Sequence, residues 1–228
     1  MEFSMPIIRR LADSDNPTSY ANRLRSKRFQ RFESLIASLP RPLQMLDVGG
    51  TNEFWESRGW AGRSDVFIKT LNIAAEEQRH ENIQPLAGDA TDLKCFTDQS
   101  FDVVFSNSVI EHLFTLENQG RMASEIQRVG KAFWVQTPNY WFPMEPHFHV
   151  PGWQWLPLGL RVRMLQRRRC GWRGPCSDSV KARRLVEEVR LLTGRELSRM
   201  FPGATLLPER FCGLVKSWTA IKGFHSNH

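Results

Sequence analysis

Hydrophobic positions along the chain follow two alternating patterns. Short apolar runs, typical of buried strands, alternate with longer stretches in which apolar residues recur every three or four positions. The apolar runs predict strands at 45–48, 66–71, 83–87, 103–105, 132–136, 204–207 and 214–221. The amphipathic stretches predict helices at 18–38, 116–129, 180–192 and 194–200, with further helices between the early strands. This alternation predicts an α/β fold built on one sheet.

The amino-acid composition changes after Pro138, where the segment "NYWFPMEPHFHVPGWQWLP" is rich in Pro, Trp and His. Such a composition favours an irregular segment over a regular helix or strand. We therefore expect a lid over about residues 139–176, inserted in a main domain that covers 41–228. Residues 1–40 are expected to form an N-terminal helical segment.

A length of 228 residues suits one sizeable domain with a real core. No apolar run approaches the roughly 18 residues that a membrane-spanning helix needs, and the first residues lack the apolar core of a secretory signal. The four cysteines match neither a zinc knuckle nor a redox pair. We expect a cytoplasmic protein, with peripheral contact at the inner face of the membrane as an open alternative.

The net charge of +7 is unevenly distributed. Residues 1–150 carry 16 basic and 19 acidic side chains, whereas residues 151–228 carry 15 and 5, so the two parts contribute −3 and +10. The segment from Arg161 to Arg173 has six arginines and no acid. It is expected to attract phosphate, nucleic acid or an anionic membrane surface, or to be a solvated helix face.

The segment "MLDVGG" is a short apolar strand that ends in Asp47, followed by Gly49 and Gly50. A Gly-rich turn after a buried strand brings backbone close to a ligand, and parallel sheets bind ligands outside the carboxyl ends of their strands. The dinucleotide fingerprint G-x-G-x-x-G is absent, because Gly49, Thr51 and Phe54 stand at its three positions. A small-molecule site is expected here, although a simple tight turn is the alternative.

Later segments add to this motif in a fixed order: "FIKTLNIA", "LAGDATDL", "FDVVFSNSVIEHL" and "VGKAFWVQTPN". With "MLDVGG", they resemble the class I S-adenosylmethionine-dependent methyltransferases, in particular the type 11 group, over about residues 43–222. The resemblance implies a Rossmann-like methyltransferase fold, with a mostly parallel seven-stranded sheet and an antiparallel last strand. It also implies S-adenosyl-L-methionine as the cofactor.

By this resemblance, Asp47, Gly49 and Gly50 cradle the amino-acid end of the cofactor. The family has glycine where this chain has Thr51, and an acid that binds the ribose hydroxyls where this chain has Asn72. An amide still bonds a hydroxyl, but without the charge-assisted strength of a carboxylate. Both departures bear on the cofactor affinity.

The resemblance further implies that Asp89, with the backbone of Ala90, binds the adenine. Asn107 and Ser108 are expected beside the cofactor. An alternative for Asp89 is a capping role at a turn beginning near Thr91, because Asp is a favoured capping residue.

A sulfonium methyl group is a strong electrophile, so the protein must hold a nucleophile in line with it. A hydroxyl nucleophile also needs a base, and histidine suits this role at neutral pH. The candidates are His112, His147 and His149. Glu111 is equally compatible with an exposed polar residue. His147 and His149 have metal-like spacing, but no third ligand is evident, so no metal site is expected.

The expected acceptor is a small molecule or glycan, with O-methylation of a sugar hydroxyl as the leading hypothesis. The sugar could be lipid-linked, because the lid combines aromatic residues with positive charge. Two alternatives remain: a nucleic-acid methyltransferase, which is less favoured because no RNA-binding motif is present, and a non-catalytic binding protein that has lost the cofactor.

Overall fold

The computed structural model describes residues 20–224, which divide between two compact units. One unit covers residues 41–223. The other contains helix α2 (Tyr20–Ile36), where the predicted helix at 18–38 lies as far as it falls within the described residues. The apolar positions Phe29, Phe32 and Ile36 of α2 are its buried side chains, as its helical spacing predicts.

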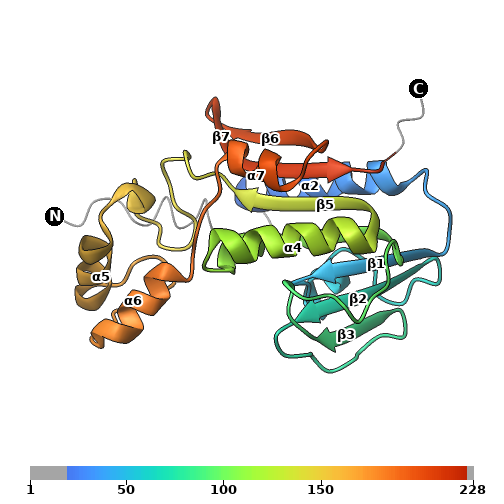
Figure 1. Cartoon of the computed structure of the whole chain (residues 1–228), viewed down its shortest axis with the longest axis horizontal. Coiled ribbons are helices and arrows are strands. Elements are labelled where there is room, and N and C mark those ends of the chain that lie inside the picture. Colours follow the sequence, from blue (N-terminus) through green and yellow to red (C-terminus); the bar gives the residue numbers. More distant parts are fainter. Residues whose placement is uncertain (1–19, 225–228) are drawn as a thin grey trace. The chain divides into compact units, whose positions relative to one another are not determined.

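The unit that covers residues 41–223 is built on a seven-stranded sheet with the strand order β3-β2-β1-β4-β5-β7-β6. Five strands run parallel, and β7 is antiparallel to both of its neighbours, β5 and β6. This confirms the predicted Rossmann-like α/β fold with an antiparallel last strand (Figure 1). The strands are β1 (Leu43–Val48), β2 (Val66–Asn72), β3 (Ile83–Ala87), β4 (Phe101–Asn107), β5 (Gly130–Pro138), β6 (Thr205–Phe211) and β7 (Leu214–Lys222).

Each predicted strand is present, and most extend one to four residues beyond the apolar run that predicted them. The helix predictions were less accurate. A short helix, α3 (Asn52–Ser57), follows β1, but residues 73–82 and 88–100 form no helix between β2, β3 and β4. Both connections are polar and lack the apolar stripe that a helix would bury against the sheet, so the expectation of a helix after each early strand was wrong.

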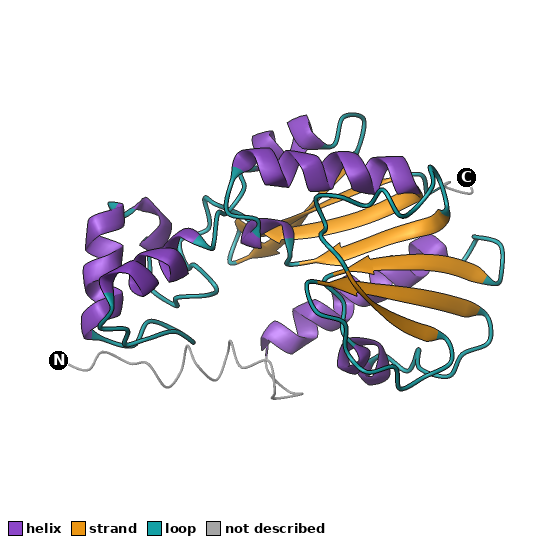
Figure 2. Cartoon of the chain, turned by 60° about the horizontal axis from the view of Figure 1, so that its bottom comes forward, coloured by secondary structure: helices purple, strands orange, loops and turns teal. Residues whose placement is uncertain are grey.

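Helix α4 (Leu116–Val129) lies over one face of the sheet with α7 (Gly194–Met200), as Figure 2 shows. Met122, Ile126 and Val129 follow helical spacing and are fully buried in the main core. Thr115 begins α4, because its side chain accepts a hydrogen bond from the backbone N–H of Asn118. Both helices have the bounds that the sequence predicted.

The lid is more ordered than its composition suggested. It contains the short helix η2 (Trp153–Trp155) and helix α5 (Leu158–Arg167), and it packs with helix α6 (Ser179–Glu187) beyond the carboxyl end of β5 (Figure 1). Phe148, Trp153 and Leu165 belong to a separate small core there. The predicted helix at 180–192 ends early, at Glu187. Within residues 20–224, none of the helices has the length and apolarity needed to cross a bilayer.

Candidate functional site

The turn after β1 is closed by close contacts that only glycine permits. Gly49 has a φ of +84°, and a Cβ there would lie 2.3 Å from a methyl carbon of Val109. A Cβ on Gly50 would lie 1.9 Å from a carboxyl oxygen of Asp47. The two glycines are therefore required by the packing of the turn itself, whatever the turn binds.

Asp47 is buried under this turn, and its Oδ2 accepts a hydrogen bond of 2.8 Å from the indole Nε1 of Trp55. Burial raises the pKa of the Asp47 carboxyl to about 7, and the Trp55 hydrogen bond opposes that rise. Asp47 thus packs against the buried side of the glycine turn. Trp55, which the sequence analysis did not single out, holds its carboxyl in place.

The strand registers bring the ends of β1, β2 and β4 together. Val48 lies beside Leu71 on one side and Ser106 on the other, and the backbone N–H of Gly49 donates to Leu71 O at 2.7 Å. Asn72 follows at the end of β2, and its Nδ2 donates to Gly50 O at 2.5 Å. The side chain of Asn72 therefore reaches the glycine turn, and its role in binding the cofactor ribose stays a prediction.

The end of β4 is fixed by β5. Asn107 pairs in register with Gln136, and Ser108 donates both its backbone N–H and its hydroxyl to Gln136, at 3.0 and 2.9 Å. Ser108 has a φ of +59°, a conformation uncommon outside glycine. Asn107 and Ser108 thus lie at the same edge of the sheet as the glycine turn, two strands from Asn72.

Asp89 is exposed, and its Oδ1 accepts hydrogen bonds from both the backbone N–H and the hydroxyl of Thr91, each at 2.8 Å. This is the local capping role that was considered as the alternative to adenine binding. Ala90 beside it is buried. The geometry leaves the second carboxyl oxygen of Asp89 available at the surface, and the role of Asp89 in adenine binding stays a prediction.

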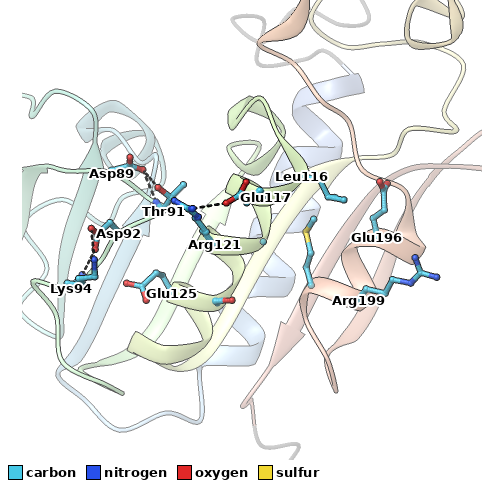
Figure 3. A pocket seen from close by; sticks show the side chains of 13 residues that line it. Asp89, Thr91, Asp92, Lys94, Leu116, Glu117, Arg121, Glu125, Glu196 and Arg199 are labelled. Atoms are coloured by element: carbon cyan, nitrogen blue, oxygen red, sulfur yellow. Dashed lines mark hydrogen bonds and ion pairs between the residues drawn. The ribbon is translucent and has the colours of Figure 1, made fainter.

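A hollow of about 960 Å³ runs along the outer side of α4, between the loop after β3 and α7 (Figure 3). Asp89 lines it together with Arg121, which is paired with Glu117 at 2.7 Å, and with Glu196 and Arg199. The other predicted cofactor residues do not line this hollow. It lies beside the carboxyl edge of the sheet and is distinct from the glycine turn.

The chemistry of the side chains at the sheet edge is compatible with S-adenosylmethionine. Asn72 places an amide beside the glycine turn, with its Nδ2 bonded to Gly50 O, and Asn107 and Ser108 follow at the end of β4. Ile73, directly after Asn72, is 84% exposed, an apolar side chain available to cover an aromatic ring.

The structure brings His112 and His147 together. His112 lies in the short helix η1 (Ile110–His112) after β4, and its ring centroid is 4.7 Å from that of His147, in an edge-to-face arrangement. Burial, together with the charge of His147, lowers the pKa of His112 to about 4. His112 is therefore a neutral imidazole at physiological pH.

His147 is held by Glu145, which is itself buried. The Nδ1 of His147 contacts Glu145 Oε1 at 2.5 Å, and Glu145 Oε2 accepts the backbone N–H groups of His147 and Phe148 at 2.8 and 2.6 Å. Burial disfavours protonation of His147, but the hydrogen bond and charge of Glu145 outweigh it, so the His147 pKa is raised. Glu145 stands two residues before His147, and sequence reasoning missed it.

Glu111 is fully buried, so its interpretation as an exposed polar residue was wrong. Its Oε2 accepts a hydrogen bond of 2.9 Å from the hydroxyl of Thr137 at the end of β5. Its Oε1 has no hydrogen-bond partner among the described residues. Burial raises the Glu111 pKa to about 7.

Ligand atoms of Glu111, His112 and His147 all lie within 4.8 Å of one another. The two histidines that share a neighbourhood with a third ligand type are therefore His112 and His147, not His147 and His149. His149 is outside this cluster, with a φ of +49° and its ring 5.3 Å from that of Trp172. The catalytic roles of the three histidines stay predictions, but only two of the three side chains share a site.

A second hollow, of about 800 Å³, lies where the lid meets α6 and the segment that leads to α7. Glu145, the partner of His147, is in its wall, whereas His112 and His147 do not line it. Arg161 from α5 also lines it, and the guanidinium Nε of Arg161 has no hydrogen-bond partner in the described part of the chain. Aromatic walls come from Tyr140 and Trp153.

Comparison with known proteins bears on the fold and the family of the chain. Residues 63–132 match a family described as a methyltransferase domain. The match runs from β2 to the first residues of β5, and it leaves out the glycine turn and the lid. Two uncharacterized proteins from strains of Mycobacterium tuberculosis are 36% identical over 66 residues. Those matches cover 29% of this chain and 22% of the length of the relatives.

Two solved structures show the same fold. The N-methyltransferase NodS from Bradyrhizobium japonicum WM9 has a TM-score of 0.50 at 10% identity, covering 88% of this chain and 96% of its own. A possible exported protein from Bordetella parapertussis has a TM-score of 0.51 at 15% identity, covering 95% and 78%. At such low identity the likeness concerns the fold alone.

Proposed function

We propose that the chain is a class I S-adenosylmethionine-dependent methyltransferase and that it methylates a hydroxyl group of a sugar, free or lipid-linked. The observation that carries this proposal is the hollow of about 800 Å³ whose wall includes Glu145, the residue that orients His147. A substrate in this hollow would lie close to the only pair of histidines that the structure brings together among residues 20–224.

The cofactor would be held at the carboxyl edge of β1, β2 and β4, and it supplies the electrophilic methyl group. Gly49 and Gly50 would let the backbone approach its amino-acid end, supported from below by Asp47. The Asn72 amide would bond a ribose hydroxyl. Asp89 with Ala90 would bind the adenine, and Asn107 and Ser108 would line the same edge of the sheet.

The acceptor hollow combines aromatic and cationic side chains. Tyr140 contributes an aromatic side chain to its wall, whereas Trp153 is buried there in a stack with Phe148. Arg161 contributes a guanidinium whose Nε is unbonded in the described residues. Planar guanidinium groups bind phosphate in a bidentate fashion, which suits a sugar that carries phosphate. The lid, residues 139–176, would therefore build the acceptor site.

The histidine cluster would orient or deprotonate the acceptor hydroxyl. His147 is the better base of the pair, because Glu145 holds its ring and raises its pKa, whereas His112 has its pKa lowered to about 4. His149 is the third candidate, but it lies against Trp172 instead of the pair.

Peripheral contact with an anionic membrane is the second part of the proposal. Exposed apolar side chains of the lid, Trp141, Trp155, Leu160 and Trp172, accompany the arginines of the Arg161–Arg173 segment. Aromatic residues mixed with cationic ones bind the interface between headgroups and acyl chains. A protein at the inner membrane face would meet a lipid-linked glycan there.

The activity is tested by incubating the full chain with S-adenosylmethionine labelled in its methyl group, together with phosphorylated sugars, lipid-linked glycans or RNA. We expect label in the carbohydrate as a base-stable ether. Label in RNA would favour a nucleic-acid methyltransferase and overturn the sugar acceptor. Label in none of these classes, with intact S-adenosylhomocysteine binding, would overturn the proposed acceptor class.

The membrane contact is tested by co-sedimentation with vesicles rich in phosphatidylserine. Replacing Arg163, Arg167 and Arg168 by Gln should weaken binding by at least tenfold, since each basic side chain near an anionic surface contributes about 1 kcal/mol. The matched control replaces three exposed arginines elsewhere, Arg121, Arg195 and Arg199. Equal losses in both variants would contradict a lid-specific contact.

A further inference from the structure

We propose that Glu111, His112 and His147 form a binding site for a divalent first-row transition-metal ion. The three residues come from two segments that are far apart in sequence, the turn after β4 and the lid. Their ligand atoms lie within 4.8 Å of one another, so small side-chain adjustments bring all three to one ion.

The Glu111 carboxyl provides an independent observation that points to a ligand. It is fully buried, and its Oε1 has no hydrogen-bond partner among the described residues. An unpaired buried carboxyl oxygen is costly, because burial removes the water that would otherwise solvate it. A cation bound to Oε1 would replace that lost solvation.

The neighbours of the three ligands are arranged as the outer partners of metal ligands are. Glu145 bonds the Nδ1 of His147, which leaves Nε2 as the ligand atom and fixes the direction of the ring. Thr137 bonds the Oε2 of Glu111, which leaves Oε1 for the ion. Both partners are buried, so they hold the ligands without competition from solvent.

The ligand types select the class of ion. Two imidazole nitrogens and one carboxylate oxygen suit Zn²⁺, Fe²⁺, Co²⁺ or Mn²⁺, whereas Mg²⁺ and Ca²⁺ prefer oxygen ligands throughout. Three protein ligands leave at least one coordination position open. The site is therefore of the kind that binds an exchangeable ligand.

The identity of that exchangeable ligand rests on the proposed function. Glu145, which holds His147, lines the acceptor hollow, so the open position would take an oxygen of the acceptor. With an ion bound, His112 and His147 are metal ligands instead of free bases. The ion would then orient the acceptor hydroxyl, in place of orientation or deprotonation by the histidines.

The site is tested without any acceptor by titrating the metal-free full chain with Co²⁺ and recording its visible absorption. We expect saturation at one ion per chain, with d–d bands that Zn²⁺ abolishes by displacement. Glu111→Gln and His112→Gln should each weaken Co²⁺ binding by at least tenfold. His149→Gln is the matched control and should leave it unchanged, because His149 lies outside the cluster.

His147→Ala is avoided because it would leave buried Glu145 without its imidazole partner. Thermal unfolding and S-adenosylhomocysteine binding of each variant check that the fold persists. No saturable Co²⁺ binding below about 100 μM, or binding that all three variants retain, would overturn the site. So would binding that His149→Gln abolishes.

Activity measurements separate this inference from the proposed function. A saturable metal site in a chain that methylates no sugar would keep the metal site and overturn the acceptor class. Sugar methylation that is undiminished after chelation, with no Co²⁺ bands, would keep the proposed function and overturn the metal site. In that case His112 and His147 act as free imidazoles.

Discussion

The surroundings of two buried carboxyl groups differ: Asp47 lies near the end of β1, and Glu111 lies in η1, after the neighbouring parallel strand β4. Each is almost completely buried, and burial raises the pKa of each to about 7. Asp47 is enclosed by protein: the indole of Trp55 donates to its Oδ2, and Gly50 lies against the carboxyl. Glu111 has one oxygen bonded to Thr137, while the other has no partner in the described residues.

The comparison separates a structural role from a chemical one. A buried acid whose contacts are supplied by its own turn stabilises that turn, as Asp47 does beneath the glycines. A buried acid with an unbonded oxygen beside two imidazoles retains capacity for a ligand. Burial therefore accompanies a structural role at Asp47, which supports the glycine turn, and a candidate ligand role at Glu111.

The largest loss of stability is expected from a substitution that places an extra atom against the enclosed Asp47 carboxyl. Gly50→Ala places a Cβ 1.9 Å from Asp47 Oδ2, so it should destabilise the fold by about 3 kcal/mol or more and abolish cofactor binding. Gly120→Ala is the control, because nothing lies within 4 Å of its Cβ, and Ala should stabilise α4 by about 0.5–1 kcal/mol. Urea unfolding measures both. A Gly50→Ala protein as stable as Gly120→Ala would show that the turn is open.

The free energy of unfolding should depend on pH because of both Asp47 and Glu111. Each carboxyl has a folded-state pKa near 7, above its ordinary value, so the folded state holds a proton that the unfolded state loses. The free energy of unfolding should therefore fall as pH rises from about 4 to 7, and then level off.

Asp47→Asn and Glu111→Gln should each remove part of that fall, raising stability at pH 8 by on the order of a few kcal/mol relative to pH 4. Denaturant unfolding in the presence of a chelator measures this. If stability is flat between pH 4 and 7 in the unsubstituted chain, the carboxyl groups are solvated, and the comparison fails.

Trp55→Phe tests the comparison because it leaves an oxygen of the Asp47 carboxyl without its hydrogen bond, as Glu111 Oε1 is among the described residues. It removes the indole N–H that bonds Oδ2, and it should destabilise the fold by about 2 kcal/mol and raise the Asp47 pKa further. The double variant with Asp47→Leu should recover part of this loss, because no unpaired carboxyl remains. Independent, additive effects would mean that the hydrogen bond contributes little.

The smallest effect is expected at the outer partner of Glu111. Thr137→Val removes the hydroxyl that bonds Oε2 while it keeps the shape, and it should weaken metal binding by about tenfold. Its cost in metal-free stability should be about 1 kcal/mol. Thr70→Val is a suitable control, since Thr70 is buried in β2 and its hydroxyl has no partner among the described residues. Equal metal affinity in both variants would contradict a supporting role for Thr137.

The strands of the sheet were predictable because they are buried and apolar over most of their length. A buried strand leaves a short apolar run in the sequence, and these runs predicted the strand positions. The missing helices after β2 and β3 were not predictable from the alternation alone, because that pattern fixes the strands and not the form of short polar connections. The lid was harder still. Its small core, with Phe148, Trp153 and Leu165, joins side chains from an irregular segment and a helix, and such contacts have no local period.

The residues of the candidate site also fall into a predictable group and an unpredictable one. Gly49, Gly50 and Asn72 come at strand ends, so the order of strands predicted their neighbourhood. The approach of His112 and His147 depends on how the lid folds over the end of β4, which no spacing within the sequence specifies. Glu111 was misjudged because its burial comes from packing in the folded unit, whereas its sequence neighbours suggested an exposed turn.

The central claim, that S-adenosylmethionine binds at the edge formed by β1, β2 and β4, is tested most directly by calorimetric titration with S-adenosylhomocysteine. The full chain should bind it saturably at one molecule per chain, and Asn72→Ala should weaken binding by about tenfold, or about 1.4 kcal/mol. Gly120→Ala should bind as the unsubstituted chain does. Absence of binding up to millimolar concentration, or equal affinity in Asn72→Ala, would contradict the cofactor site at this edge.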